Sequence, residues 1–138
     1  MKQIKRRIAW TGMLVLTVFL FGCKSDKLDE EKVTNIEYTV TSEDRLPAEL
    51  KELVEEKKQQ PFKMTFRDGE YLYICQGYGK QPCGGYSIQV EEVYRTANAV
   101  YFSAALIGPT QAEAQMQMPT YPYIVIKTEY QDMTVVFD

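Results

Sequence analysis

The 138-residue sequence contains no histidine and only three cysteines, and these shortages restrict the chemistry that it can perform. Histidine is the commonest general base near neutral pH, so its absence removes both Ser–His and Cys–His nucleophile pairs. Zinc sites usually take four ligands, mostly cysteine or histidine, and this sequence has too few of these residues to indicate such a site. We therefore expect a protein that is not an enzyme and that holds no metal or other cofactor.

The sequence also lacks a nucleotide-binding loop, although it contains a glycine-rich stretch, QGYGKQPCGGYSIQV, at residues 76–90. A phosphate-binding loop joins a strand to a helix, and its lysine is followed by serine or threonine. Here Lys80 is followed by Gln81, and the alternating residues after Gly85 predict a strand. The stretch is better interpreted as a tight connection between two strands.

The chain begins with a basic head and an apolar run of 14 residues from Ile8, after which it becomes polar. This order is typical of a secretory signal peptide, and the run is shorter than the ~20 residues that span a bilayer. LFGC at residues 20–23 resembles the bacterial lipobox, in which cleavage precedes a cysteine that receives lipid. The alternative is an uncleaved anchor with an unmodified Cys23. We predict a lipoprotein signal peptide at residues 1–22, lipid on Cys23 and an extracytoplasmic location on the cell membrane.

Beyond the leader the chain is strongly acidic. Four of the 16 basic residues lie in the leader, so residues 23–138 carry 12 basic and 19 acidic side chains and a net charge of −7. Phosphate binding needs a basic surface, so we expect no nucleic-acid partner. The acidity gives no attraction to anionic lipid either, so membrane attachment would depend on the lipid on Cys23.

The polar residues after the leader form the next segment. Residues 24–35, KSDKLDEEKVTN, cannot bury enough apolar area to offset the entropy of ordering them. We therefore predict a flexible acidic tether over residues 23–35 and a single domain over residues 36–138, a size that suits one hydrophobic core.

One amphipathic helix is predicted near the start of this domain. Pro47 suits a first helical turn, and Pro61 lies beyond the last. The apolar positions between them recur at i, i+4, i+7 and i+8 and form one stripe: Leu46, Leu50, Leu53 and Val54. The helix therefore has one face for packing on a sheet.

The remaining sequence alternates with period two and predicts about seven short strands. Their expected positions are residues 36–40, 62–66, 70–75, 84–90, 100–107, 121–127 and 133–137. Because the connections are short, the strands should be mostly antiparallel. We predict an α+β fold in which one N-terminal helix packs on a mostly antiparallel sheet or small sandwich.

Local details of three connections can also be predicted. Asp68–Gly69 between two alternating runs marks a hairpin, with Phe66 opposite Tyr71 and Cys75 on the same side as the aromatic residues. The alternation slips at residues 91–93, which indicates a bulge. Residues 108–120 form a long connection with no helical stripe, either a plain loop or an adaptable docking loop carrying Met116 and Met118.

The two cysteines of the domain are an even pair in a compartment where thiols tend to be oxidised. A Cys75–Cys83 disulfide would close a loop of about nine residues and stabilise the fold by ~2–3 kcal/mol in the chain-entropy model. Two free buried thiols are the main alternative. A redox-active pair is the third, although the C-x-x-C spacing is absent.

Three pieces of the sequence together resemble the C-terminal domain of the PrcB family of protease-complex subunits. They are YGKQPCGGYSIQV, GPT at residues 108–110 and PTYPYIVIK at residues 119–127. The resemblance covers roughly residues 62–137. The matching residues are Gly84, Gly85, Tyr86, Ile88, Val90, Pro109, Tyr121, Pro122 and Tyr123.

The resemblance implies a non-catalytic, extracytoplasmic module, because the family is named for a lipoprotein subunit of a surface protease complex and its members carry no recognised catalytic residues. We therefore expect a surface-anchored protein-interaction module with a protein partner in the cell envelope, for which an extracellular protease is the candidate. The alternative is a lipoprotein that binds glycans or peptides through some of its ten tyrosines.

Overall fold

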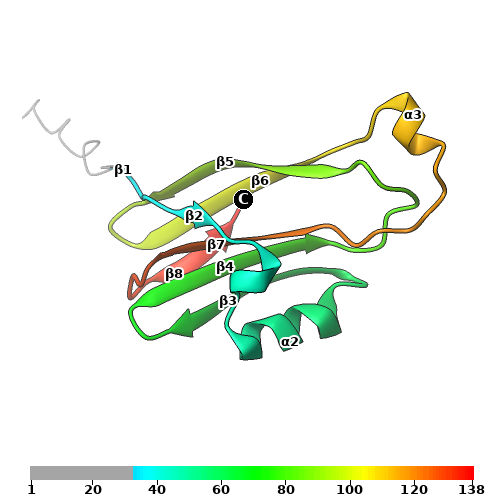
Figure 1. Ribbon diagram of the computed structural model, residues 1–138. Helices are drawn as coiled ribbons and strands as arrows, with labels where there is room; N and C mark the ends of the chain where they lie inside the picture. Colours follow the sequence, from blue (N-terminus) through cyan, green and yellow to red (C-terminus); the bar gives the residue numbers. More distant parts are fainter. Residues whose placement is uncertain (1–32) are drawn as a thin grey trace, which may run out of the picture. The chain divides into compact units, whose positions relative to one another are not determined.

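Two four-stranded β-sheets face each other in the computed structural model, which describes residues 33–138 (Figure 1). The first sheet has the order β1 (Thr34–Asn35), β5 (Ser87–Arg95), β6 (Ala99–Ile107) and β8 (Thr134–Phe137). The second has the order β2 (Thr39–Val40), β7 (Tyr123–Glu129), β4 (Tyr71–Tyr78) and β3 (Pro61–Asp68). All neighbours are antiparallel except β6 and β8, which are parallel. The predicted mostly antiparallel β-structure is confirmed, with eight strands in the described part of the chain.

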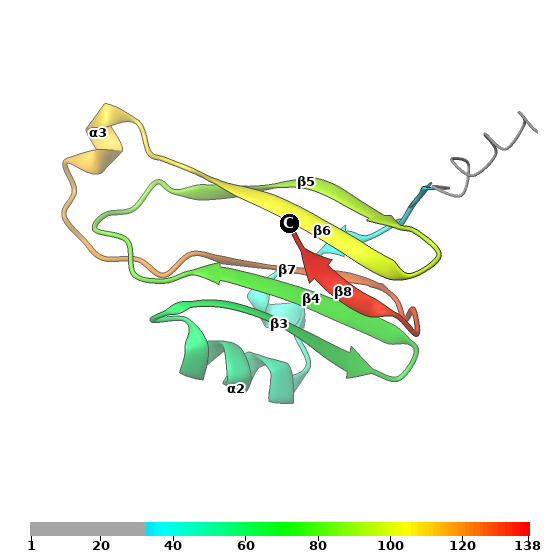
Figure 2. The same cartoon turned by 180° about the vertical axis from the view of Figure 1, so that it is seen from behind.

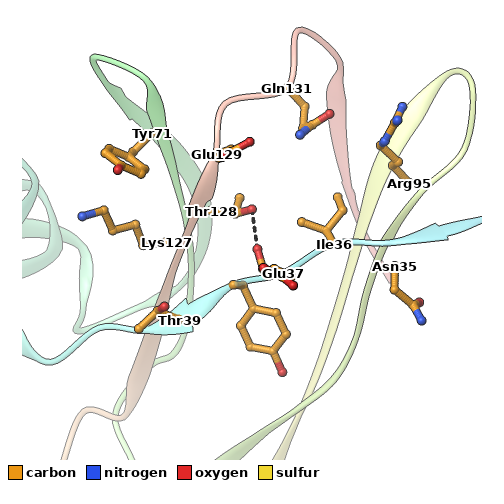
Figure 3. A pocket seen from close by; sticks show the side chains of 11 residues that line it. Asn35, Ile36, Glu37, Thr39, Tyr71, Arg95, Lys127, Thr128, Glu129 and Gln131 are labelled. Atoms are coloured by element: carbon orange, nitrogen blue, oxygen red, sulfur yellow. Dashed lines mark hydrogen bonds between the residues drawn. The ribbon is translucent and has the colours of Figure 1, made fainter.

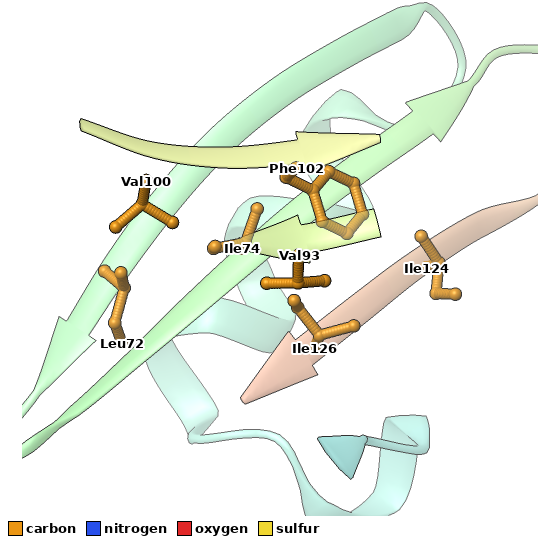
Figure 4. Packing of buried hydrophobic residues seen from close by; sticks show 7 residues of the cluster. All are labelled: Leu72, Ile74, Val93, Val100, Phe102, Ile124 and Ile126. Atoms are coloured by element: carbon orange, nitrogen blue, oxygen red, sulfur yellow. The ribbon is translucent and has the colours of Figure 1, made fainter. Parts of the chain in front are cut away.

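The main core lies between the two sheets, where branched side chains of β4 and β7 meet those of β5 and β6 (Figure 4). Its buried members are Leu72, Ile74, Val93, Val100, Phe102, Ile124 and Ile126. Phe102 at its centre also meets Phe137 of β8 edge-on, with ring centroids 5.8 Å apart. The arrangement is that of a β-sandwich, in which alternate residues of both inner faces interdigitate.

A second, smaller core lies on the other face of the second sheet, where helix α2 (Ala48–Lys57) packs (Figures 1 and 2). The predicted stripe supplies its helical side, with Leu50 and Val54 buried against Tyr73 and Cys75. Because both faces of β4 are covered, every residue of that strand from Leu72 to Gly77 is buried.

The β3–β4 hairpin forms at the predicted place but in a different register. Phe66 pairs with Tyr73 and Asp68 with Tyr71, so the two-residue loop is Gly69–Glu70 rather than Asp68–Gly69. Gly69 has φ 63°, whereas Glu70 does not have a positive φ, which is the pattern of a turn with glycine in its first central position. The shift is two residues, so side chains keep their faces and Cys75 still lies among the aromatic residues.

The predicted bulge in β5 is confirmed. The pairing of β5 with β6 shifts register between Val90 and Glu92, so Glu91 is the extra residue. The bulge lets Val90 and Val93 both point into the core although they are three residues apart.

The single strand expected at residues 36–40 is wrong. The chain instead forms β1 in the first sheet, crosses the side of the sandwich and forms β2 in the second. The crossing is held by Ile36 N–H, which donates to Val93 O at 3.1 Å, and by Thr128 Oγ1, which donates to Glu37 O at 2.8 Å. Because β1 lies inside the predicted tether, the ordered domain begins before Ile36.

The predicted signal peptide, the lipidated Cys23 and the tether up to residue 32 lie outside the described residues. Within residues 33–138 no helix is both long and apolar enough to cross a membrane.

Candidate functional site: a loop platform at one end of the sandwich

The three sequence pieces that resemble the PrcB family meet at one end of the sandwich, beside helix α3 (Gln111–Ala114) (Figures 1 and 2). We call this end the loop platform and define it as residues 79–86 and 108–122. The first segment joins β4 to β5, and the second joins β6 to β7. Two segments separated by the β5–β6 hairpin are therefore side by side, and Gln81 pairs with Thr120.

Glycine is required at two positions of the first segment. Gly79 and Gly85 have φ angles of 76° and 85°, which side chains rarely tolerate. A Cβ at Gly79 would lie 2.9 Å from the Pro61 ring, and one at Gly85 would lie 2.7–2.8 Å from Glu113 of α3. Gly84 has neither constraint, because a Cβ there would meet only a Thr120 methyl group at 4.0 Å. Gly85 is therefore a position at which the backbone of the first segment lies close against α3 of the second.

Glu113 is held against Gly85 by a capping box at the start of α3. Its N–H donates to Thr110 Oγ1 at 3.2 Å, while its own Oε1 accepts from the Thr110 N–H at 2.9 Å. These hydrogen bonds to the charged form hold the pKa of the Glu113 carboxyl below its usual range. The GPT piece of the sequence thus fixes the residue that covers Gly85.

Thr120 joins the other end of the second segment to the glycine-rich loop. Its backbone exchanges two hydrogen bonds with Gln81, at 2.8 and 3.0 Å, and its Oγ1 donates to Cys83 O at 2.8 Å. Pro122 O accepts from the Tyr78 N–H at 3.0 Å. The PTYPY piece therefore extends the β4–β7 pairing beyond the sheet and ties both segments together.

The structure brings together most of the predicted family residues but not all of them. Gly84, Gly85 and Tyr86 lie in the first segment, Pro109, Tyr121 and Pro122 in the second, and Tyr123 begins β7. Ile88 and Val90 instead pack against the sandwich core. The platform residues thus form a connected structure, whereas these two residues help to position it.

The second segment presents the most exposed apolar surface of the platform. Every residue from Gln111 to Pro119 is exposed, and Met116 and Met118 are 65% and 67% exposed. The predicted plain loop is thus a capped helical turn followed by an exposed pair of methionines. Flexible methionine side chains suit apolar contacts with a partner surface.

The predicted Cys75–Cys83 disulfide is replaced in the structure by two free, buried thiols. Cys75 pairs with Val125 inside the second sheet, whereas Cys83 lies beyond it, held to Thr120. Thr120 and Val125 are five positions apart along an extended chain, roughly 16 Å at ~3.3 Å per position. A disulfide needs Cα atoms within ~7 Å, so this fold separates the two cysteines too far. Burial raises the pKa of the Cys75 thiol to about 12.

Sequence patterns did not predict a groove that lies where the chain crosses from β1 to β2 (Figure 3). It is an open groove of about 560 Å³ whose lining includes Arg95, Lys127, Glu37 and Glu129. Lys127 Nζ lies 4.2 Å from the centre of the Tyr71 ring. The groove carries both signs of charge, and residues 33–138 contain no cluster of acidic or thiol groups suited to a metal ion. No local signal marks it, because it depends on the unpredicted crossing.

The comparisons with known proteins agree with the position of the platform. The family model described as PrcB C-terminal matches residues 72–129, a span that begins in β4, ends in β7 and contains the whole platform. No curated protein and no solved structure matches the chain. Over residues 72–129 this protein is therefore similar to the PrcB C-terminal family.

Proposed function

We propose that this protein is a non-catalytic, lipid-anchored module of the cell envelope that docks onto a partner protein through the loop platform, and that the partner is an extracellular protease. The observation that carries the proposal is the assembly of the platform. Three separate pieces of the family segment are tied to one another by Gly85–Glu113 contact, the Thr110 cap and the Thr120 hydrogen bonds.

The architecture supports docking more than chemistry. The glycines and the helix cap of the platform stabilise the shape of its loops. The most exposed apolar side chains on these loops are those of Met116 and Met118. Binding residues are disproportionately placed on loops held by a rigid scaffold, and here the scaffold is the sandwich.

The experiment is a pull-down from membranes with chemical crosslinking, using the full chain as bait. The wild-type chain should recover one envelope protein above background. The double variant Met116→Glu, Met118→Glu should recover at least tenfold less of this partner, because its carboxylates would be placed in an apolar contact. The matched control is Val40→Glu, which places a carboxylate at a similarly exposed apolar position of β2, 56% exposed, and should recover the partner normally.

Recovery of no protein above background, with crosslinking included, would count against the proposal. An equal loss of partner recovery in the Val40→Glu control would show that the platform is not the docking surface. Binding of a defined sugar on a glycan array, together with an empty pull-down, would instead favour a glycan-binding lipoprotein.

A further inference from the structure

One edge of the first sheet is unpaired next to the platform. β5 pairs with β6 along its length, but β1 covers its outer edge only at Tyr94 and Arg95. One more bond, from Ile36 N–H to Val93 O, ends this contact, because the chain then crosses to the second sheet. No strand within residues 33–138 pairs with the outer edge of β5 from Ser87 to Glu92.

The register identifies which backbone groups point outward along this edge. Val93 directs its carbonyl toward β1, so its partner Phe102 on β6 belongs to a pair that does not exchange hydrogen bonds. Ala104 and Leu106 of β6 have the same parity as Phe102, and they pair with Val90 and Ile88. The N–H and C=O groups of Ile88 and Val90 therefore point outward, whereas those of Gln89 face β6.

We propose that this edge, Ser87–Glu92, accepts an extended basic segment of a partner protein as an added strand that continues the position of β1. Backbone hydrogen bonds along a free sheet edge supply affinity in this mode, and alternate side chains supply specificity. The proposal rests on the proposed function, since it states how the docked partner is recognised. The edge begins one residue after Tyr86, so it continues the platform without interruption.

The charge of the neighbouring groove identifies the kind of segment. A groove of about 500 Å³ lies beside the bulge, and its lining includes Glu91, Glu92, Val33 and Tyr38 but no basic residue. Neither glutamate forms an ion pair within residues 33–138, and the Glu91 carboxylate is held only by Ser103 Oγ, which donates to Glu91 Oε1 at 3.1 Å. A strand that alternates lysine or arginine with apolar residues would place its cations on these carboxylates.

A second copy of this chain fits the edge less well. Pairing two β5 edges would bring the carboxylates of four glutamates into one interface, and like charges across paired strands destabilise the pairing. We therefore expect a basic segment of a different protein to occupy this edge.

The test uses the full chain and a synthetic ten-residue peptide that alternates lysine with valine. Amide hydrogen exchange of the free chain should be fast at Ile88 and Val90 and slow at Gln89. Addition of the peptide should slow exchange at Ile88 and Val90 at least tenfold. Protection of these two amides in the free chain would overturn the proposal, because the edge would already be covered.

Two methylated peptides give a sharper control, because a strand uses only alternate amides to bond a given edge. N-methylation of the lysine amides in one peptide and of the valine amides in the other should leave one binding within threefold of the parent and weaken the other at least tenfold. Equal affinities of the two methylated peptides would contradict strand addition.

Variants of the protein test the charge. Glu91→Gln with Glu92→Gln should weaken the peptide at least tenfold at low salt, while Glu52→Gln with Glu56→Gln on the exposed face of α2 should leave it unchanged. Concentration-dependent dimerisation that protects the same amides would overturn the proposal in favour of a second copy.

The outcomes separate this proposal from the proposed function. If the peptide binds to the β5 edge but the membrane pull-down recovers no protein, the edge site is supported and the proposed docking to an envelope protease is contradicted. If a partner is recovered but its complex leaves the amides of Ile88 and Val90 unprotected from exchange, docking is supported and strand addition at the β5 edge is contradicted.

Discussion

Substitution of Gly85 by alanine tests the idea that the platform is built by contact between its two segments. Gly85 has φ 85°, and a methyl group there would lie 2.7–2.8 Å from Glu113 Oε1, Cβ and Cδ. The left-handed backbone costs a residue with a side chain ~1–2 kcal/mol. Displacing Glu113 would also break the capping box, at a cost of ~1 kcal/mol. We expect Gly85→Ala to lower the free energy of unfolding by ~2–3 kcal/mol in total.

The neighbouring glycine is the matched control. Gly84 does not have a positive φ, and its added methyl group would meet only Thr120 Cγ2 at 4.0 Å. Where the backbone is compatible, alanine restricts the unfolded chain and stabilises by ~0.4–1 kcal/mol. Gly84→Ala should therefore be neutral or slightly stabilising.

Urea unfolding of the two variants and the wild type measures the difference directly, since a shift of the midpoint at constant slope is a change in stability. Similar losses in Gly84→Ala and Gly85→Ala would refute the reasoning, because they would mean that the Glu113 contact does not distinguish the two glycines.

Two further predictions concern the helix-covered face of the second sheet. Leu50→Ala should cost ~3 kcal/mol in thermal unfolding, because Leu50 is 0% exposed beneath α2; Leu53→Ala, at a half-buried position, should cost less than half as much, and equal losses would argue against the assigned helix face. Burial raises the pKa of the Cys75 thiol from 9.0 to about 12, so the native thiol stays protonated while the unfolded one ionises above about pH 9. The free energy of unfolding of the wild type should therefore fall as pH rises from about 9 to 12. Below about pH 9 the contribution of the buried Cys75 thiol is fully retained. Comparison of urea midpoints at pH 8 and 11 should show a smaller loss in Cys75→Ala, and parallel losses would contradict the buried-thiol interpretation.

Local patterns predicted those parts of the fold that neighbouring residues determine. The apolar stripe from Leu46 gave the helix and its packing face, and the alternation slip at residues 91–93 gave the bulge. The hairpin was placed by its Asp–Gly pair, but the loop moved by one residue because glycine takes the first central position and Glu70 the second. Moving the loop by one residue changes the strand pairing by two residues, which leaves every side chain on its face. Periodicity alone therefore cannot distinguish the two registers.

Features that depend on distant partners could not be predicted in the same way. The crossing at residues 36–38 is determined by bonds to Val93 and Thr128, far away in the sequence. The predicted disulfide was based on compartment and even count, but the distance between Cys75 and Cys83 is set by the extension of β4–β7 pairing to Thr120. The platform itself was visible only as three separate motifs, because their contact through Gly85 and Glu113 requires the folded chain.

The most direct test of the docking account is site-specific photo-crosslinking on intact cells, with the photoreactive residue placed at Met116, at Met118 or at Glu49 on α2. All three side chains are exposed. The account predicts an adduct with the same envelope protein from both methionine positions and none from Glu49. An adduct from Glu49 alone, or no adduct from any of the three positions, would contradict it.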